Sequence, residues 1–370
     1  MRSNNIYYEK KGFATMKRFW SLLLCMALIT AALAGCGGTQ PGTASNESQN
    51  SGSSSGTQSP DPKPAEQIVI KISHQNAITH PTQKGLEKFK ELLEEKTGGA
   101  MTCDIYDSGV LGNDTSNLQQ VISGSLDAAM IMGADIWQGY DKRAMIENLP
   151  FMFSDYEEAR GAWDGEFGSY MKENILDPCG GHVVNFWENG FRHFTNNTRP
   201  ISVPSDCAGL KFRTADNPLR LMMFEEFGSS AIVIAFSELY SALQQKTVDG
   251  QENPLSNIVS SCFYEVQKYL SLSSHIYSTS VFVFSDKCWN SLTQEQQQIV
   301  YDCAEEAKLV TRDLTESMDA DYLQTCKDNG MEVNEIDVEA FREACQPVWD
   351  YFESEYGSEL VDLVRAAQKS

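Results

Sequence analysis

GLKFRTADNPLRLMMFEEFG (residues 209–228) and AFSELYSALQQKTVDGQENPL (residues 235–255) are the two segments that say most about the fold and chemistry of this chain. The first places one arginine, Arg213, inside an apolar run that is typical of a strand. A buried guanidinium requires an anion. In the second segment, AFSELYSALQQ predicts a short amphipathic helix, and VDGQENP predicts a turn rich in amide and carboxyl groups.

Strand geometry gives Arg213 a direction. Successive side chains of a strand point to opposite faces, so if Leu210 and Phe212 face a core, Arg213 faces a cleft. Arg192, in ENGFRHFTN, occupies a similar strand. Two converging guanidinium groups match a carboxylate with parallel hydrogen bonds. The alternative is that each arginine pairs with a nearby acid, such as Glu188 or Asp216, and only fastens the fold.

Outward from this region, the pattern predicts an α/β body in which strands and helices alternate. A strand–helix–strand–helix–strand succession near the start indicates parallel pairing. From Thr293, a capping box with Gln296 opens one long helix that ends at Asn329-Gly330. The expected strands are IVIKISHQ (68–75), MTCDIYDSG (101–109), LDAAMIMGAD (126–135), VVNFWENGFRHFTN (183–196), LKFRTA (210–215) and HIYSTSVFVFS (275–285).

The N-terminus predicts export. Basic residues precede the uncharged FWSLLLCMALITAALAGC, so residues 1–35 are expected to be a signal peptide, starting at Met1 or Met16. Leu33-Ala34-Gly35-Cys36 resembles a bacterial lipobox, which implies acylation of Cys36. Residues 36–66, rich in Ser, Gly and Pro, are expected to be a flexible lipid-anchored tether. The predicted location is therefore the outer face of the bacterial cell membrane.

Composition excludes several classes of function. The formal net charge is −22, which disfavours nucleic-acid binding because phosphate contacts need clustered Lys and Arg. The five histidines show no metal-ligand spacing, and no catalytic base or nucleophile is marked. We therefore predict no enzyme activity, cofactor or metal. Eight cysteines follow Cys36, and their pairing cannot be deduced from the sequence.

Several separate stretches, in the same order, resemble the substrate-binding proteins of tripartite ATP-independent periplasmic (TRAP) transporters. The resemblance covers residues 67 to about 365. It rests on EKFKELLEEKTGG, SGVLGN, ENGFRHFTNNTRPI, GLKFRTADNP, AFSELYSALQQKTVDGQENP, FYEVQKYLSLSSHIYS and LTQEQQQIVYDCAEEA. It implies a two-lobed periplasmic-binding-protein-like (flytrap) fold, with hinge strands and a long helix spanning both lobes. The expected lobes are 67–190 plus 279–318, and 191–278 plus 319–370.

The resemblance also implies roles for individual residues. Arg213 is expected to form a bidentate salt bridge with the ligand carboxylate, with Arg192 as its helper. The other expected ligand-binding residues are Asn253 (an amide at the same end), Phe236 (an apolar wall), Asp216 and Glu188 (acceptors for hydroxyl groups), Trp187 (a stacking face), and Gln75 and Asn76 (from the other lobe).

The implied function is capture of an organic acid and its delivery to the small and large TRAP membrane subunits by a protein expected to be monomeric. Met132, Gly133 and Ala134 replace the acidic residue of the sialic-acid branch, which disfavours sialate. A sugar acid such as a hexuronate, or a C4-dicarboxylate, is expected instead. Two alternatives remain, namely a ligand-sensing module for a membrane receptor and an exported lyase acting on acidic sugars.

Overall fold

The computed structural model describes residues 67–368, and the predicted signal peptide, tether and Cys36 lie outside them. Ten strands of this part form one mixed sheet. The strands are β1 (Ile68–Ser73), β2 (Met101–Tyr106), β3 (Ala128–Ile131), β4 (His182–Asn196), β5 (Lys211–Thr214), β6 (Ser230–Val233), β7 (Gly250–Pro254), β8 (Tyr269–Leu272), β9 (Tyr277–Phe284) and β10 (Glu332–Glu335).

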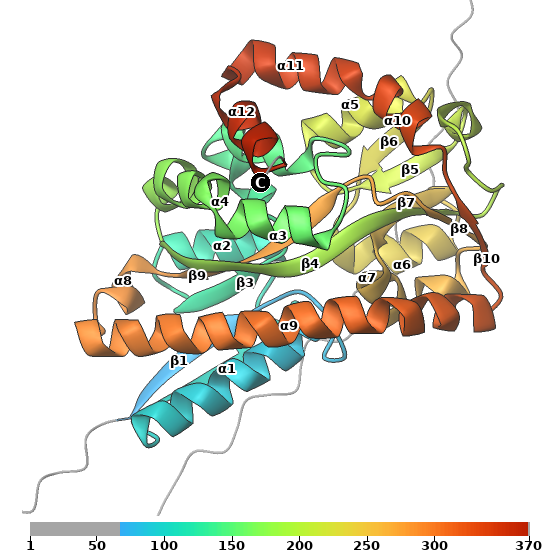
Figure 1. Ribbon diagram of the computed structural model, residues 1–370. Coiled ribbons are helices and arrows are strands. Elements are labelled where there is room, and N and C mark those ends of the chain that lie inside the picture. Colours follow the sequence, from blue (N-terminus) through green and yellow to red (C-terminus); the bar gives the residue numbers. More distant parts are fainter. Residues whose placement is uncertain (1–66, 369–370) are drawn as a thin grey trace, which may run out of the picture. The chain divides into compact units, whose positions relative to one another are not determined.

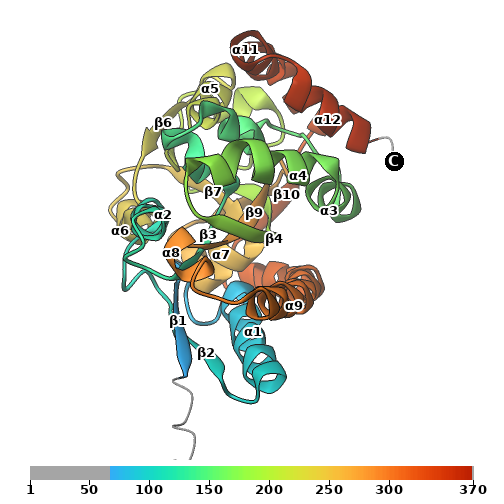
Figure 2. The same ribbon diagram turned by 90° about the vertical axis from the view of Figure 1, so that its left-hand side faces the viewer.

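Helices cover both faces of this sheet. Figure 2 shows α1 and α9 on one side of the strands and α11 and α12 on the other. The α-helices are α1 (Pro81–Thr97), α2 (Asp114–Ile122), α3 (Tyr156–Asp164), α4 (Glu166–Met171), α5 (Pro218–Glu226), α6 (Phe236–Gln244), α7 (Leu255–Ser260), α8 (Asp286–Trp289), α9 (Gln294–Asp328), α10 (Val338–Ala344), α11 (Gln346–Tyr356) and α12 (Glu359–Ala367). Within the described part, none of the helices combines the length and apolar character needed to span a membrane.

The main path of the sheet runs β2-β1-β3-β9-β4-β7-β5-β6, with β8 and β10 attached beside β4. As predicted, β1 pairs in parallel with both β2 and β3. The 15-residue strand β4 joins the two halves of this path, because it pairs with β9 from His182 to Phe191 and with β7 from Arg192 onward. A register shift between Glu188 and Gly190 marks a bulge just before this change of partner.

The long helix α9 lies along the whole assembly in Figure 1. The predicted Thr293–Gln296 capping box is present, and Asn329 is the C-cap, so both ends are confirmed. The middle of α9 is polar where it is buried. There, Arg312 and Lys308 both contact Asp164 of α3, at 2.5 and 3.1 Å respectively. This shared carboxylate holds α9 against α3.

The strand β7 corrects the prediction of a turn at VDGQENP. All five residues of β7 are buried, and the strand pairs antiparallel with β4 and parallel with β5. The polar residues Gln251, Glu252 and Asn253 suggested a loop, but each of these side chains has a hydrogen-bond partner inside the protein. A buried strand tolerates polar side chains when their hydrogen bonds are satisfied.

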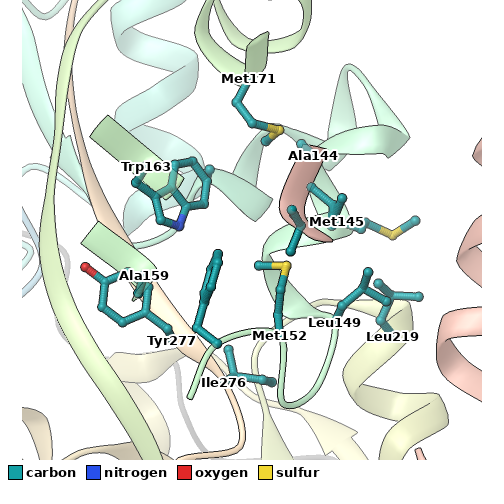
Figure 3. Close-up of a cluster of buried hydrophobic side chains, with 14 of the residues drawn as sticks. Ala144, Met145, Leu149, Met152, Ala159, Trp163, Met171, Leu219, Ile276 and Tyr277 are labelled. Carbon is teal, nitrogen blue, oxygen red and sulfur yellow. The ribbon is translucent and has the colours of Figure 1, made fainter. Parts of the chain in front are cut away.

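Apolar packing fills the space between the sheet and the helices. One cluster, seen in Figure 3, brings Trp163 of α3, Met171 of α4 and Tyr277 of β9 together. All eight cysteines from Cys103 to Cys345 are free thiols. This core holds the described residues together without a disulfide among them.

Gly85 provides a test of the contact between α1 and the sheet. A Cβ at this position would overlap the Thr311 hydroxyl and approach Trp187 to 2.5 Å. We expect Gly85→Ala to destabilise the fold by about 1–3 kcal/mol, because overpacking displaces neighbouring groups. Chemical denaturation measures this change.

The matched control is Gly161→Ala in α3, where an added Cβ meets no atom within 4 Å. Alanine favours a helix over glycine, so this variant is expected to be more stable by about 0.5–1 kcal/mol. Equal effects of the two substitutions would contradict the tight packing at Gly85.

Candidate functional site

A cavity of about 390 Å³ lies where β5, β6 and β7 face the loop after β1, the start of α2 and the 3₁₀ helix Ala134–Gly139. Six of the nine predicted ligand-binding residues line it, namely Gln75, Arg192, Arg213, Asp216, Phe236 and Asn253. Residues missed by the sequence analysis also line it, among them Asp114, Asp135, Asn189, Arg220 and Asn257.

Arg213 is a buried cation of this cavity that forms no salt bridge with the described residues. Its residue is 4% exposed, and its Nε donates to the carbonyl of Ile234 at 2.9 Å. Within residues 67–368, neither terminal nitrogen of Arg213 has a hydrogen-bond partner. The guanidinium carbon lies 6.0 Å from the centre of the Phe236 ring. The fork of the guanidinium is therefore available to a ligand.

Burial makes the charge on Arg213 costly. Desolvation lowers the pKa of Arg213 to about 9, and the positive charges of Arg192 and Arg220 act in the same direction, partly offset by Glu252. Arginine still carries its charge at neutral pH. A bound anion would offset the lost solvation, which makes the cavity electrostatically favourable to an anionic group.

Arg192, the predicted helper, is already largely occupied. Its Nε bonds to the carboxylate of Glu252, and its Nη2 donates to the Glu252 carbonyl at 2.6 Å and to Asn253 Oδ1 at 3.0 Å. Among the described residues, nothing accepts from its Nη1. Arg192 therefore lines the cavity as a partly used donor, and Asn253 is tied to it.

Arg220 and Glu252 complete the cluster, and both were missed from the sequence. Arg220 Nη1 donates to Glu252 Oε1 at 3.1 Å, and its Nη2 lies 3.9 Å from Asp135. Although burial opposes ionisation of Glu252, Arg192 and Arg220 hold the pKa of its carboxyl well below the usual range. The available signal was the single arginine in the apolar helix LRLMMF (219–224). Glu252 thus bonds to two arginines but forms no salt bridge with Arg213.

Glu188 and Trp187 do not line the cavity, which corrects their predicted roles. The carboxylate of Glu188 accepts from Arg160 at 2.8 and 2.9 Å and from Tyr277 at 3.1 Å, and it is fully buried. Trp187 is also fully buried and packs against Phe282, so no sugar can stack on it. The bulge after Glu188 brings Asn189 to the cavity instead, where its buried Oδ1 has no hydrogen-bond partner among residues 67–368.

Asn76 lies behind the cavity wall rather than in it. It is 1% exposed, and its Oδ1 accepts from Asn257 of α7 at 3.5 Å. The neighbouring His80 ring has its Nε2 3.2 Å from Asn257 Oδ1. Asn76 therefore joins the loop after β1 to α7, and it is Asn257 that reaches the cavity.

Asp114, the first residue of α2, also lines the cavity. Gln75 Nε2 donates to its Oδ2, and the residue is 4% exposed. Burial raises the pKa of Asp114 to about 8. A neutral carboxyl group can both donate and accept a hydrogen bond, which suits a hydroxyl group of a ligand.

The pKa of Asp114 predicts a dependence of stability on pH. The folded protein holds this proton up to about pH 8, whereas an unfolded chain releases it near the ordinary pKa of 3.8. The stability that this group contributes is therefore complete below pH 3.8 and is lost as the pH rises toward 8. We expect Asp114→Asn to remove this loss, so that its advantage in melting temperature over the native protein grows from pH 5 to pH 8.

Thermal melts of both proteins across that pH range measure the effect. Asp313→Asn on the exposed side of α9 is the control, because this carboxyl group lies at the surface and does not line the cavity. A constant difference between Asp114→Asn and the native protein would contradict a raised pKa.

A cavity inside an α/β fold, with one uncompensated guanidinium among polar side chains, is typical of proteins that bind small anionic solutes. The family model described as "Bacterial extracellular solute-binding protein, family 7" (DctP) matches residues 72–355. The chain therefore belongs to the DctP family of TRAP solute-binding proteins. This confirms the family resemblance.

Three known proteins illustrate the similarity. The C4-dicarboxylate-binding periplasmic protein DctP of Rhodobacter capsulatus is 32% identical over 317 residues, covering 83% of this chain and 92% of its own length. A TRAP periplasmic solute-binding protein from Ochrobactrum anthropi, with a C-terminus bound in its ligand-binding pocket, is 37% identical, with a TM-score of 0.75 and coverage of 82% and 96%. The sugar acid binding protein DctPAm of Advenella mimigardefordensis, in complex with galactonate, is 33% identical, with a TM-score of 0.79 and coverage of 82% and 98%.

These solved relatives share the fold over most of their length, so the predicted two-lobed α/β class is confirmed. The family consists of extracytoplasmic solute-binding proteins rather than enzymes. The predicted roles of individual cavity residues toward a ligand stay predictions.

Proposed function

We propose that this protein is the extracytoplasmic binding component of a TRAP transporter, which captures an organic acid through a salt bridge between Arg213 and the ligand carboxylate. The observation that carries the proposal is the buried guanidinium of Arg213, a cavity-lining residue whose two terminal nitrogens have no hydrogen-bond partner in the described part of the chain. Two parallel hydrogen bonds from this fork fit one carboxylate. Arg192 adds its remaining donor at the same end.

The ligand class proposed is a hydroxylated acid, such as a hexuronate or another sugar acid. The groups named for the three relatives, namely a C4-dicarboxylate, a polypeptide C-terminus and galactonate, share a carboxylate. Six amide side chains line the cavity, among them Gln75, Gln138 and Asn189. Amides pair well with hydroxyl groups, which favours a sugar acid over a short dicarboxylate.

Delivery to the two membrane subunits requires that the lobes open and close. The proposed lobes are residues 67–190 with 279–318, and residues 191–278 with 319–370. Polar contacts cross this boundary beside the cavity, including Asn217 Nδ2 to Asp135 at 3.2 Å. Such contacts exclude water around the carboxylate and strengthen its hydrogen bonds. Because α12 contacts α3 and α4 of the first lobe, the C-terminal segment crosses the boundary as well.

Replacing Arg213 tests the proposed salt bridge. Each hydrogen bond to a charged group contributes about 1.5–3 kcal/mol, so losing both in Arg213→Ala is expected to weaken binding at least about 100-fold. Arg213→Lys keeps the charge but loses the fork, and is expected to retain little affinity. A thermal-shift screen of sugar acids and dicarboxylates identifies the ligand, since about 2.7 kcal/mol of stability is gained at 100 times the Kd. Calorimetry then measures each variant.

Arg342→Ala is the control, because Arg342 lies exposed on α10, and the cavity lining does not include it. Its affinity is expected to equal that of the native protein. Near-native affinity of Arg213→Lys would refute the bidentate salt bridge, and a screen in which no carboxylate raises the melting temperature would refute the proposed function.

Attachment to the membrane through Cys36 is a further part of the proposal. An acylated cysteine holds a protein at a membrane by burying acyl methylene groups, each contributing about 0.8 kcal/mol. We expect the full-length chain, expressed in a bacterium, to partition into detergent, and Cys36→Ser to remain in the aqueous phase. Cys25→Ser, within the predicted signal peptide, is the control. Equal partitioning of all three forms would contradict lipidation at Cys36.

A further inference from the structure

A second cavity, of about 270 Å³, adjoins the first. Gln75, Asn113 and Phe236 line both cavities. The second cavity continues between the turn at Ser108-Gly109 on one side and the start of α6 and the end of α7 on the other. A ligand held in the first cavity therefore has a neighbouring space into which a longer molecule can extend.

The chemistry of the second cavity differs from that of the first. Three arginines, three aspartates and a lysine line the first cavity, whereas no charged side chain lines the second. Its lining is made of aromatic rings, amides and small hydroxyl residues. The residues are Gln75, Ala77, Ser108, Gly109, Asn113, Phe236, Ser237, Tyr240, Ser260, Ser261 and Phe263.

Hydroxyl groups in this second cavity are free to bind. Within residues 67–368, the side chains of Ser237, Ser260 and Ser261 have no hydrogen-bond partner. Each hydroxyl is both a donor and an acceptor, as are the hydroxyl groups of a sugar. Such a set of unused groups beside aromatic rings matches a neutral polyhydroxylated molecule.

The walls of the second cavity are held in place. Phe236 packs edge-on against the buried Phe263, with ring centres 5.9 Å apart. The Tyr240 hydroxyl donates to Glu265 at 2.6 Å, which fixes that ring. On the opposite wall, the amide of Ser108 donates to the carbonyl of Asn76 at 2.8 Å. A preformed wall loses little entropy when a ligand binds.

Phe236 lies between the two cavities and lines both of them. The centre of its ring is 6.0 Å from the guanidinium carbon of Arg213. A group attached to an acid anchored at Arg213 therefore passes this ring to reach the second cavity. We infer that the second cavity is a subsite for a neutral sugar joined to the acid by a glycosidic bond, so that the ligands include acidic disaccharides. This inference rests on the proposed function.

Three probes test the inference by calorimetry: D-glucuronate, glucuronate joined to a neutral hexose in several linkage isomers, and succinate. At least one disaccharide is expected to bind the native protein as tightly as glucuronate. Ser237→Trp, which fills the second cavity from an exposed position, is expected to weaken disaccharide binding at least about tenfold, equal to about 1.4 kcal/mol, and to leave glucuronate within about twofold.

Ser241→Trp is the matched control, because Ser241 is exposed one turn further along α6 and lines neither cavity. It is expected to change neither affinity. The inference is overturned if every disaccharide binds at least about tenfold more weakly than glucuronate, or if Ser237→Trp weakens both sugars equally. Binding of succinate alone would overturn it while leaving the proposed function intact, and binding of no acid in the wider screen would overturn both.

Discussion

The binding site depends on a buried cluster of three arginines that has too few neighbouring acids to pair with all of them. Glu252 accepts from Arg192 and Arg220, and no carboxylate lies within salt-bridge distance of Arg213 in the described chain. Burying an unpaired charge costs several kcal/mol even after local relaxation. The fold carries this cost at one position, and it is the position where an external carboxylate would relieve it. Binding energy and local instability therefore have the same origin.

The backbone of β4 determines which side chains meet at this position. Its first part pairs with β9 and its last part with β7, so a single strand carries the sheet past the cavity. The bulge between Glu188 and Gly190 changes the alternation of faces. Glu188, before the bulge, bonds to Arg160 of α3, whereas Asn189 and Arg192 line the cavity. A small irregularity of the strand thus separates the structural acid Glu188 from the binding site.

The same bulge explains why only some residues of the site could be predicted from the sequence. The direction of Arg213 could be predicted because it alternates with Leu210 and Phe212, which are buried as expected. The position of Glu188 could not be predicted, because the alternation of side chains along a strand takes no account of a bulge. The bulge is visible only in the pairing of β4 with β9. Glu252 was placed in a supposed turn because its polar neighbours resemble a loop, and their partners come from distant strands. Local patterns report the helices and strands well, but they do not report which polar groups satisfy one another.

Long-range electrostatics make the local arrangement necessary. With a formal net charge of −22, the protein repels anions at a distance, so steering by the overall field cannot favour an acidic ligand. Surface charges are screened beyond about 8 Å at physiological ionic strength, whereas the guanidinium of Arg213, a residue that is 4% exposed, is screened much less. Recognition therefore begins only when the carboxylate has entered. At that range the affinity depends on the geometry of the guanidinium fork. A molecule with the right charge but the wrong shape therefore gains little affinity.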